Sequence, residues 1–259
     1  MMTAESSCVR GRFAPSPSGP LHFGSLVAAL ASYLDARSVG GLWLLRMEDL
    51  DPPREQPGAA GLILEQLRDH GLHWDGEVLF QSTREAAYAQ ALHSLAQRQQ
   101  GFVCRCTRRQ LEGHAHYPGT CREAQLSPDD GPHAWRLRSP DGQDDFVVKR
   151  ADGFWAYHLA VVVDDAFQDI THIVRGDDLA AELPRHRWLQ IALGLDQPEV
   201  LHVPVLRNSN GEKLSKQTQA PALSGGDRVH QQLRDAWDYL EQVMPRALVE
   251  RWELVYRAF

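Results

Sequence analysis

The chain has 259 residues, of which 43% are hydrophobic and 24% charged, and its formal net charge at pH 7 is −7. This composition supports one large domain or two small ones with a buried core, and it excludes low-complexity disorder. The negative charge excludes a protein that coats nucleic acid through a basic surface, so any contact with RNA has to use a local patch.

The first seventy residues alternate between strand and helix patterns. Cys8–Ala14 is expected to form a strand, which enters a loop of turn-forming residues at Pro15–Pro20. A helix is expected from about Ser25, followed by a second strand over Leu42–Arg46 and a second helix over Ala59–His70. Strands that alternate with helices in this way are typical of a parallel α/β sheet.

The rest of the chain is less regular. Residues 101–150 show little periodicity. Helices are expected over Arg84–Gln99 and Ala180–Leu193, and two further helices close the chain. Short strands are expected at Ala134–Arg138, Phe146–Arg150, Phe154–Asp164, Asp169–Arg175 and Glu199–Leu206.

Nothing in the sequence indicates a membrane span or an export signal. The longest unbroken apolar run, Leu26–Ala31, is far shorter than the ~20 residues that cross a bilayer. Met1–Arg10 lacks the apolar stretch of a secretory signal. We therefore expect a cytoplasmic protein that has no membrane partner and acts as a monomer.

His22 and Gly24 lie where the first loop enters its helix. A helix N-terminus offers unpaired N–H groups and a partial positive charge, both of which suit a phosphate. The His22 imidazole can donate to a phosphate oxygen, and Gly24 leaves room for a nucleotide. Alone, the pair is better explained as a turn histidine and a helix-start glycine.

Lysine is scarce in this chain, which makes one short segment conspicuous. Lys149, Lys213 and Lys216 are the only lysines, and the last two lie three positions apart. A loop with two flexible ammonium groups can bind a triphosphate and stabilise the transition state at its α-phosphate. The alternative is a solvated basic turn.

These two segments together carry a family resemblance. Pro15–Ser25 resembles the HIGH motif of class I aminoacyl-tRNA synthetases, and Lys213–Gln217 resembles their KMSKS motif. Two departures are visible, because Ser25 replaces the last HIGH histidine and Gln217 replaces the last KMSKS serine. The resemblance implies catalytic roles for His22, Gly24, Lys213, Ser215 and Lys216, with ATP bound by His22, Gly24 and Lys216.

Three further segments resemble the glutamyl and glutaminyl branch of that class. They are Arg12–Gly19, Arg46–Asp51 and Val174–Asp178. The resemblance implies a Rossmann-like catalytic domain at residues 1–74 and 165–216, with an inserted acceptor and zinc-binding subdomain at 75–164. A short helical tail at 217–259 leaves no room for the anticodon-binding domain of full-length glutamyl-tRNA synthetases.

The short outline resembles the glutamyl-Q tRNA(Asp) synthetase family in particular. Members of that family activate L-glutamate with ATP and Mg²⁺ in the absence of tRNA, and transfer it to the queuosine base in the anticodon of tRNA(Asp). Two alternatives remain open. One is a truncated glutamyl-tRNA synthetase that charges tRNA(Glu), and the other is an inactive paralogue that binds tRNA.

A glutamate ligand needs cations for two carboxylates and a carboxylate for its ammonium group. Arg12 and Arg175 lie near predicted strand ends, Glu48 follows a strand, and Tyr157 offers a hydroxyl on an otherwise apolar strand. Each also has an ordinary explanation: Glu48 as a turn cap, Tyr157 as core and Arg175 as a partner of a nearby aspartate. The family resemblance implies a glutamate site built from Arg12, Phe13, Ala14, Pro15, Ser16, Glu48, Tyr157 and Arg175.

Three of the four cysteines, Cys104, Cys106 and Cys121, lie close together in the irregular segment. Three nearby thiolates indicate a structural, tetrahedral Zn²⁺ site, although three free cysteines are the alternative. On chemistry alone His114 or His116 is the more usual fourth ligand, whereas the resemblance implies Tyr117. The fourth cysteine, Cys8, is expected to be a small buried hydrophobe on the first strand.

Overall fold

The computed structural model describes residues 8–142, 144–207 and 221–259, and these divide into two compact units. Unit 1 contains the described parts of Met1–Phe80, Asp169–Ala181 and Pro198–Phe259. Unit 2 contains those of Gln81–Gln168 and Glu182–Gln197. No helix in the described ranges is long and apolar enough to cross a membrane.

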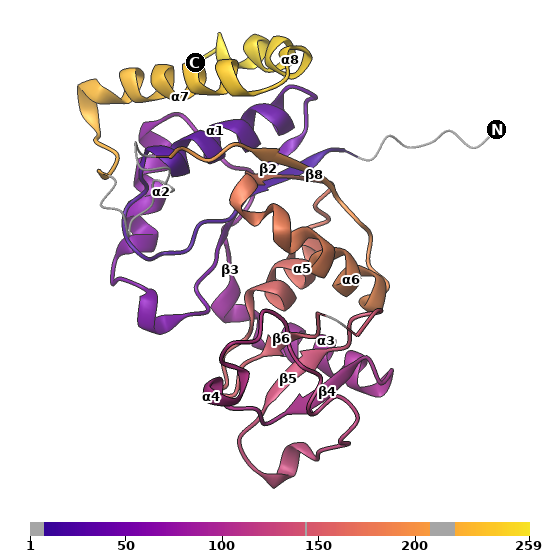
Figure 1. Cartoon of the computed structure of the whole chain (residues 1–259). Coiled ribbons are helices and arrows are strands. Elements are labelled where there is room, and N and C mark those ends of the chain that lie inside the picture. Colours follow the sequence, from indigo (N-terminus) through magenta and orange to yellow (C-terminus); the bar gives the residue numbers. More distant parts are fainter. Residues whose placement is uncertain (1–7, 143, 208–220) are drawn as a thin grey trace, which may run out of the picture. The chain divides into compact units, whose positions relative to one another are not determined.

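Unit 1 is an α/β unit built on parallel strands (Figure 1). Its strand pairs are β1–β2, β2–β3 and β7–β8, all of them parallel. Its elements are β1 (Arg10–Phe13), α1 (Phe23–Arg37), β2 (Leu42–Met47), η1 (Pro52–Arg54), α2 (Ala59–Asp69), β3 (Leu79–Phe80), β7 (His172–Gly176), η4 (Asp177–Glu182, which ends in unit 2), β8 (Glu199–Val203), η6 (Gly226–Arg228), α7 (Val229–Val243) and α8 (Arg246–Tyr256).

The β7–β8 pair lies along the edge of β1 that β2 leaves open. The Thr171 N–H donates to the Arg10 carbonyl oxygen at 3.0 Å, and the Arg10 N–H donates to the Thr171 hydroxyl at 2.9 Å. The chain therefore crosses over from β1 to β2 on one side of β1, whereas β7 lies on the other side. In open parallel sheets this reversal of strand order creates the crevice in which ligands bind.

The core of unit 1 lies around α1, which is buried on nearly every side. Leu26, Leu30 and Leu34 have no exposed surface. Helices α7 and α8 lie side by side along α1 (Figure 1), and Trp252 of α8 is fully buried. Segments from the start, middle and end of the chain thus share one hydrophobic core.

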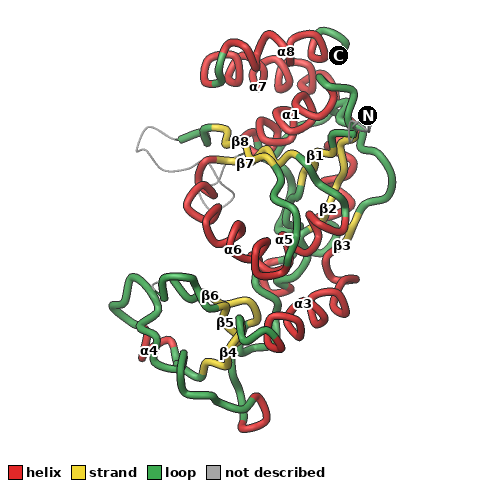
Figure 2. Tube along the Cα trace, turned by 90° about the vertical axis from the view of Figure 1, so that its right-hand side faces the viewer, coloured by secondary structure: helices red, strands yellow, loops and turns green. Residues whose placement is uncertain are grey.

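Unit 2 combines a small antiparallel sheet with four helices and two short 3-10 turns (Figure 2). The strand order is β4-β5-β6, with both pairs antiparallel. Its elements are η2 (Gln81–Arg84), α3 (Glu85–Gln97), β4 (Gly101–Cys104), α4 (Arg108–Leu111), η3 (Pro128–Asp130), β5 (Ala134–Leu137), β6 (Phe146–Lys149), α5 (Tyr157–Phe167) and α6 (Leu183–Leu193).

Three expectations differ from the structure. Phe154–Asp164 was expected to be a strand, but Tyr157–Phe167 forms helix α5. Its aromatic and β-branched residues favour strands locally, and burial on most of its faces hides the helical period, so packing overrides propensity. The other two differences concern α6 and Cys8. Helix α6 was expected within the catalytic part, but it packs in unit 2. Cys8 was expected to be buried, but it is exposed because β1 begins only at Arg10.

Candidate active site and metal centre

Two buried arginines and a carboxylate come from the carboxyl ends of three strands in unit 1. Arg12 belongs to β1 and Arg175 to β7, and only 4% and 6% of their surfaces are exposed. Glu48 directly follows β2, and its N–H donates to the Pro15 carbonyl oxygen at 3.0 Å. Because parallel strands end at one edge of a sheet, the structure brings these predicted residues to the same edge.

The loop after β1 places at this edge the other residues of unit 1 that were predicted to bind glutamate. Phe13 ends β1, while Ala14, Pro15 and Ser16 lie beyond it and range from half-buried to exposed. Hydrogen bonds from Glu48 to Pro15 and from the Gln56 N–H to the Pro17 carbonyl oxygen (3.0 Å) join the loop to the chain after β2. Its backbone is thus held on both sides of Ser16.

Arg175 is oriented by the neighbouring strand. Its Nε donates to His202 Nε2 of β8 at 3.4 Å. Burial, together with the Arg175 guanidinium, lowers the pKa of His202 below its usual value, so the imidazole stays neutral and can accept. The next residue, Gly176, has no room for a side chain, because a Cβ there would collide with Asp178 Oδ1 and Val205 Cγ1.

His22 is the N-cap of α1. Its Nδ1 accepts a hydrogen bond from the Ser25 N–H at 3.3 Å, and its carbonyl oxygen accepts from the Leu26 N–H at 3.0 Å. Because Nδ1 accepts, the neutral ring carries its proton on Nε2, which is then the donor that can face an anion. Gly24 occupies the first turn of the same helix.

The second predicted phosphate motif cannot be compared with this geometry. Lys213, Ser215, Lys216 and Gln217 lie outside the described residues. The chain is described again from Pro221, and Ala222 pairs with His22 as an antiparallel bridge. The sequence just after the motif therefore lies against the histidine that the motif was predicted to join.

Tyr157 belongs to unit 2, where it is the first residue of α5. Its half-buried ring packs edge-on against His158 and His186, with centroid distances of 5.5 Å to each. The two imidazoles are joined by a contact of 3.2 Å between His158 Nδ1 and His186 Nε2, and His158 Nε2 lies 3.4 Å from Glu182 Oε2. The tyrosine is thus held by a polar aromatic cluster that the sequence did not reveal.

That cluster continues into a bidentate ion pair. Arg185 donates to Asp144 from Nε at 2.7 Å and from Nη2 at 2.8 Å, and to Glu182 from Nη1 at 2.8 Å. The hydrogen bonds that Arg185 donates to Asp144 hold the pKa of Asp144 below its usual value and raise the pKa of Arg185.

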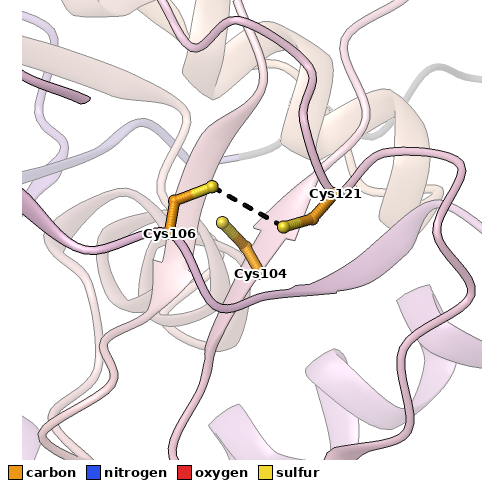
Figure 3. A group of neighbouring side chains, drawn as sticks. All are labelled: Cys104, Cys106 and Cys121. Atoms are coloured by element: carbon orange, nitrogen blue, oxygen red, sulfur yellow. Dashed lines mark hydrogen bonds between the residues drawn. The ribbon is translucent and has the colours of Figure 1, made fainter. Parts of the chain in front are cut away.

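Cys104, Cys106 and Cys121 converge at the end of β4 in unit 2 (Figure 3). Their sulfur atoms all lie within 4.8 Å of one another, and Cys106 Sγ lies 3.6 Å from Cys121 Sγ. Four ligands at a Zn–S distance of about 2.3 Å place tetrahedral sulfurs ~3.8 Å apart. The three thiols could therefore hold a metal ion with little movement.

The Tyr117 hydroxyl faces the same point. Its oxygen lies 3.5 Å from Cys104 Sγ and 3.8 Å from Cys106 Sγ, and it accepts from the Cys121 N–H at 2.7 Å. His114 and His116 are exposed, and His116 Nδ1 lies 3.7 Å from Asp144 Oδ1 instead. Of the candidates for a fourth ligand, the tyrosine is the one that the structure places beside the sulfurs.

Burial controls the protonation of this cluster when no metal is bound. It raises the pKa of Cys106 to about 11, and it raises the pKa of Tyr117 as well. Burial acts in the same sense on Cys121, but hydrogen bonds from the Arg105 backbone and from neighbouring groups outweigh it and lower that pKa. Thiols in such a crowded, buried cluster lose further protons only with difficulty. A bound cation stabilises the thiolate form and so favours proton loss.

Sequence reasoning missed a set of polar residues beside His22. Gln66 and His70 of α2 are buried, and Gln232 of α7 lies next to them. A signal was present, because Ile63, Gln66, Leu67 and His70 follow the helical spacing of a buried face. Two polar residues interrupt an otherwise apolar stripe.

Comparison with known proteins identifies the class. A family profile described as "tRNA synthetases class I (E and Q), catalytic domain" matches residues 8–129 and 135–253. The fold and the matched ranges agree, and the chain belongs to this class of synthetases, which makes it an ATP-dependent ligase.

The particular family follows from the most similar curated relatives. A glutamyl-Q tRNA(Asp) synthetase of Thiobacillus denitrificans is 55% identical over 244 residues, which cover 84% of this chain and 80% of the relative. Another, from Pseudomonas fluorescens, is 51% identical over 86% of this chain and 81% of its own length. The chain belongs to the same family as these proteins.

Among solved structures, glutamate–tRNA synthetases give a close match. The structure from Elizabethkingia anophelis superposes with a TM-score of 0.72 at 28% identity and covers 81% of this chain. This chain spans only 53% of that synthetase. A second match, to a glutamate–tRNA ligase of Elizabethkingia meningosepticum in complex with its amino acid, has the same TM-score and identity.

Proposed function

We propose that this protein activates L-glutamate with ATP in the absence of tRNA and transfers it to the queuosine base in the anticodon of tRNA(Asp). The observation that carries this proposal is the shared strand edge: the buried Arg12 and Arg175 and the carboxylate-bearing Glu48 all lie near the carboxyl ends of parallel strands. The names of the relatives supply the acceptor.

Charge complementarity supports glutamate as the substrate. Two guanidinium groups match the two carboxylates of glutamate, and Glu48 matches its ammonium group. Phe13, Ala14, Pro15 and Ser16 contribute the loop against which the backbone of the ligand lies. Tyr157, which belongs to unit 2, stays a prediction of the family resemblance.

In the first step a glutamate α-carboxylate oxygen attacks the α-phosphorus of ATP, the bond from that phosphorus to the bridging oxygen breaks, and pyrophosphate leaves. The protein contributes positioning and charge stabilisation rather than covalent chemistry. His22 Nε2–H donates to the phosphates at the start of α1, with Gly24 leaving space for the nucleotide. Lys216 neutralises the charge that develops, with Lys213 and Ser215 assisting, while bound Mg²⁺ screens the phosphates.

In the second step a hydroxyl of the queuosine base attacks the carbonyl carbon of the glutamyl adenylate. An ester forms, the acyl–phosphate bond breaks and AMP leaves. The hydroxyl proton passes to solvent or to the departing phosphate.

One structural Zn²⁺ is proposed at Cys104, Cys106, Tyr117 and Cys121. Three thiolates and a phenolate fill a tetrahedral shell and leave no open position for catalysis. When bound, the ion supplies a cross-link for a segment that has few apolar side chains of its own. The tyrosine is favoured over His114 and His116 by its 3.5 Å contact with Cys104.

The decisive experiment uses labelled glutamate, ATP and tRNA from cells with and without queuosine. Base-labile label is expected only on the tRNA(Asp) that carries queuosine. Label at the 3′ end of tRNA(Glu) would instead indicate a truncated glutamyl-tRNA synthetase. A lack of any adenylate with ATP and glutamate would indicate an inactive paralogue.

A matched pair of variants tests the phosphate motif. Lys216→Ala is expected to abolish glutamate-dependent ATP–pyrophosphate exchange while glutamate still binds. Lys149→Ala removes the only lysine outside the motif, on β6, and is expected to leave exchange intact. Equal exchange in both variants would contradict the proposed mechanism.

A further inference from the structure

In unit 1, side chains of α2, of the residue that caps α2 and of α7 form a connected set of amide and imidazole groups beside Leu21 and Leu223. Gln66 and His70 belong to the buried face at the end of α2, with 7% and 1% of their surfaces exposed. Gln232 belongs to α7. We call these three residues the amide anchor.

Gln66 bonds two backbone segments at once. Its Oε1 accepts from the Leu21 N–H at 2.8 Å, and its Nε2 donates to the Leu223 carbonyl oxygen at 3.1 Å. Leu21 immediately precedes His22, whereas Leu223 lies near the start of the last described range. One side chain therefore ties together segments about two hundred positions apart.

The two segments also pair with each other. The Leu223 N–H donates to the Leu21 carbonyl oxygen at 2.8 Å, and His22 and Ala222 form an antiparallel bridge. The position of the Leu21–His22 backbone is thus fixed from two directions, by Gln66 and by the returning chain. In the sequence, that returning chain closely follows the Lys213–Gln217 motif.

Gln232 holds the next residue of the returning chain. With its amide nitrogen towards the ring, that nitrogen lies 3.0 Å from His70 Nε2 and donates to the Ser224 carbonyl oxygen at 2.9 Å. Its oxygen accepts from the Ser224 N–H at 3.1 Å. Both backbone groups of Ser224 are satisfied by one glutamine.

His70 connects the two glutamines. Its Nδ1 lies 2.7 Å from the Gln66 carbonyl oxygen. When Nε2 accepts from Gln232, Nδ1 of the same ring carries the proton and donates to the Gln66 carbonyl oxygen. Every polar atom of the anchor discussed here then has a partner of the correct type, so its geometry is determined by hydrogen bonds rather than by apolar packing.

Apolar side chains in place of the glutamines would remove the hydrogen bonds to the Leu21 N–H and to the Leu223 carbonyl oxygen, and losing a partner is costly for a buried backbone group. Directed hydrogen bonds differ in holding two backbone segments at one fixed separation. We propose that Gln66, His70 and Gln232 are positioning residues for adenylate formation, which hold Leu21–His22 and Ala222–Ser224 together so that the His22 imidazole is aligned with the ATP phosphates.

This inference rests on the proposed function, and its test uses the chemistry of glutamate activation. Gln66→Glu keeps the acceptor for Leu21 but replaces the donor to Leu223 with an oxygen. Gln232→Glu does the same at Ser224, where the side chain is only half-buried. The matched control is Gln231→Glu, which makes the same change on an exposed neighbour in α7 whose amide donates to Asp235.

Exchange kinetics separate positioning from a merely structural role. In both anchor variants kcat for ATP–pyrophosphate exchange, normalised to titrated active sites, is expected to fall about tenfold or more. KM for glutamate should stay within about twofold, since Arg12, Glu48 and Arg175 are untouched. Gln231→Glu should match the parent. A loss that disappears after normalisation to active sites would overturn the proposal.

Hydrogen–deuterium exchange supplies a readout that does not depend on activity. The amides of Leu223 and Ser224 should exchange faster in both anchor variants than in the control, at temperatures where all three remain folded. If Gln66→Glu fails to fold, Gln232→Glu alone decides the outcome.

The two hypotheses fail in different ways. If these amides stay protected and kcat is unchanged, the anchor is not a positioning device. If the parent protein shows no pyrophosphate exchange at all, the proposed function is wrong and the role in adenylation fails with it. Faster amide exchange in the variants would then show a structural tie only.

Discussion

Single residues at the strand edge depend on neighbours that never touch a substrate. Arg175 offers a guanidinium to the proposed glutamate, yet its direction is set by His202, which must be neutral to accept from Nε. Burial and the arginine itself keep the ring neutral by lowering its pKa. A protonated His202 would repel Arg175 and release it from β8.

This relation predicts a pH dependence of glutamate binding. KM for glutamate should be constant above the ordinary imidazole value of about 6.5 and should rise as the pH falls through the lowered pKa of His202. The sign follows because acid charges the ring and removes the acceptor. In His202→Gln, whose amide oxygen accepts at any pH, the rise should be absent from a pH profile of KM. An unchanged rise would show that another group titrates.

Asp164 shows how much one buried carboxylate can hold together. It has no exposed surface, and it accepts from Gln81 Nε2 at 2.9 Å, Arg84 Nε at 3.1 Å and the Tyr88 hydroxyl at 2.5 Å. These donors come from η2 and α3, so the carboxylate joins them to α5 within unit 2.

Asp164→Ala should therefore destabilise unit 2 by about 3–5 kcal/mol, because the buried Gln81 and Tyr88 and the half-buried Arg84 lose their acceptor at once. Denaturant unfolding monitored by near-UV circular dichroism measures the loss. Asp196→Ala, at an exposed position of the same unit, should stay within about 0.5 kcal/mol of the parent. Similar losses in both variants would refute the role given to Asp164.

At the scale of elements, the sequence pattern predicted most of unit 1. In unit 2 it predicted α3, β5, β6 and α6, but it missed β4 and α4 and gave α5 as a strand. The early strands and helices have clear apolar patterns, which put Arg12, Glu48 and Arg175 near predicted strand ends. Their assignment to a glutamate site came from the family resemblance. The strand prediction for the α5 region was wrong because a helix that is buried on most faces shows no apolar stripe in its sequence. The cluster around Tyr157 and the amide anchor depend on contacts between distant segments, which no local pattern carries.

The packing of α8 on α1 gives a prediction for a whole helix. Trp252 has no exposed surface, whereas Leu254 on the same helix is 78% exposed. Trp252→Ala should cost about 3–5 kcal/mol because it opens a cavity between α8 and the core of unit 1. Leu254→Ala should change the free energy of unfolding by no more than about 0.5 kcal/mol. Thermal and denaturant unfolding of the two variants side by side would check this.

At the scale of the whole molecule, each unit buries apolar side chains of its own. In unit 1 they gather around α1. In unit 2 a small cluster of Phe102, Cys104, Tyr117 and Cys121 packs at the cysteines, while residues such as Leu95, Leu159 and Leu189 are buried elsewhere in the unit. A metal ion bound by the cysteines is therefore expected to stabilise the part of unit 2 around them.

Chelation should consequently act on one unit. Removal of the metal is expected to speed amide exchange in residues 104–126 and to leave α1, α7 and α8 unchanged. Metal analysis should find about one ion per chain in the parent and in Cys8→Ser, whose thiol is exposed and outside the cluster, but little in Cys121→Ser. Equal metal content in both variants would contradict the site.

The discontinuous layout of unit 1 has a consequence for biosynthesis. Its core joins residues near the start of the chain to Val174, Val203 and Trp252, so a growing polypeptide on the ribosome cannot complete that core until α8 has left the exit tunnel. Unit 2 has all its segments available earlier. During translation the apolar face of α1 stays uncovered longest, which makes it the segment that a chaperone has most time to bind.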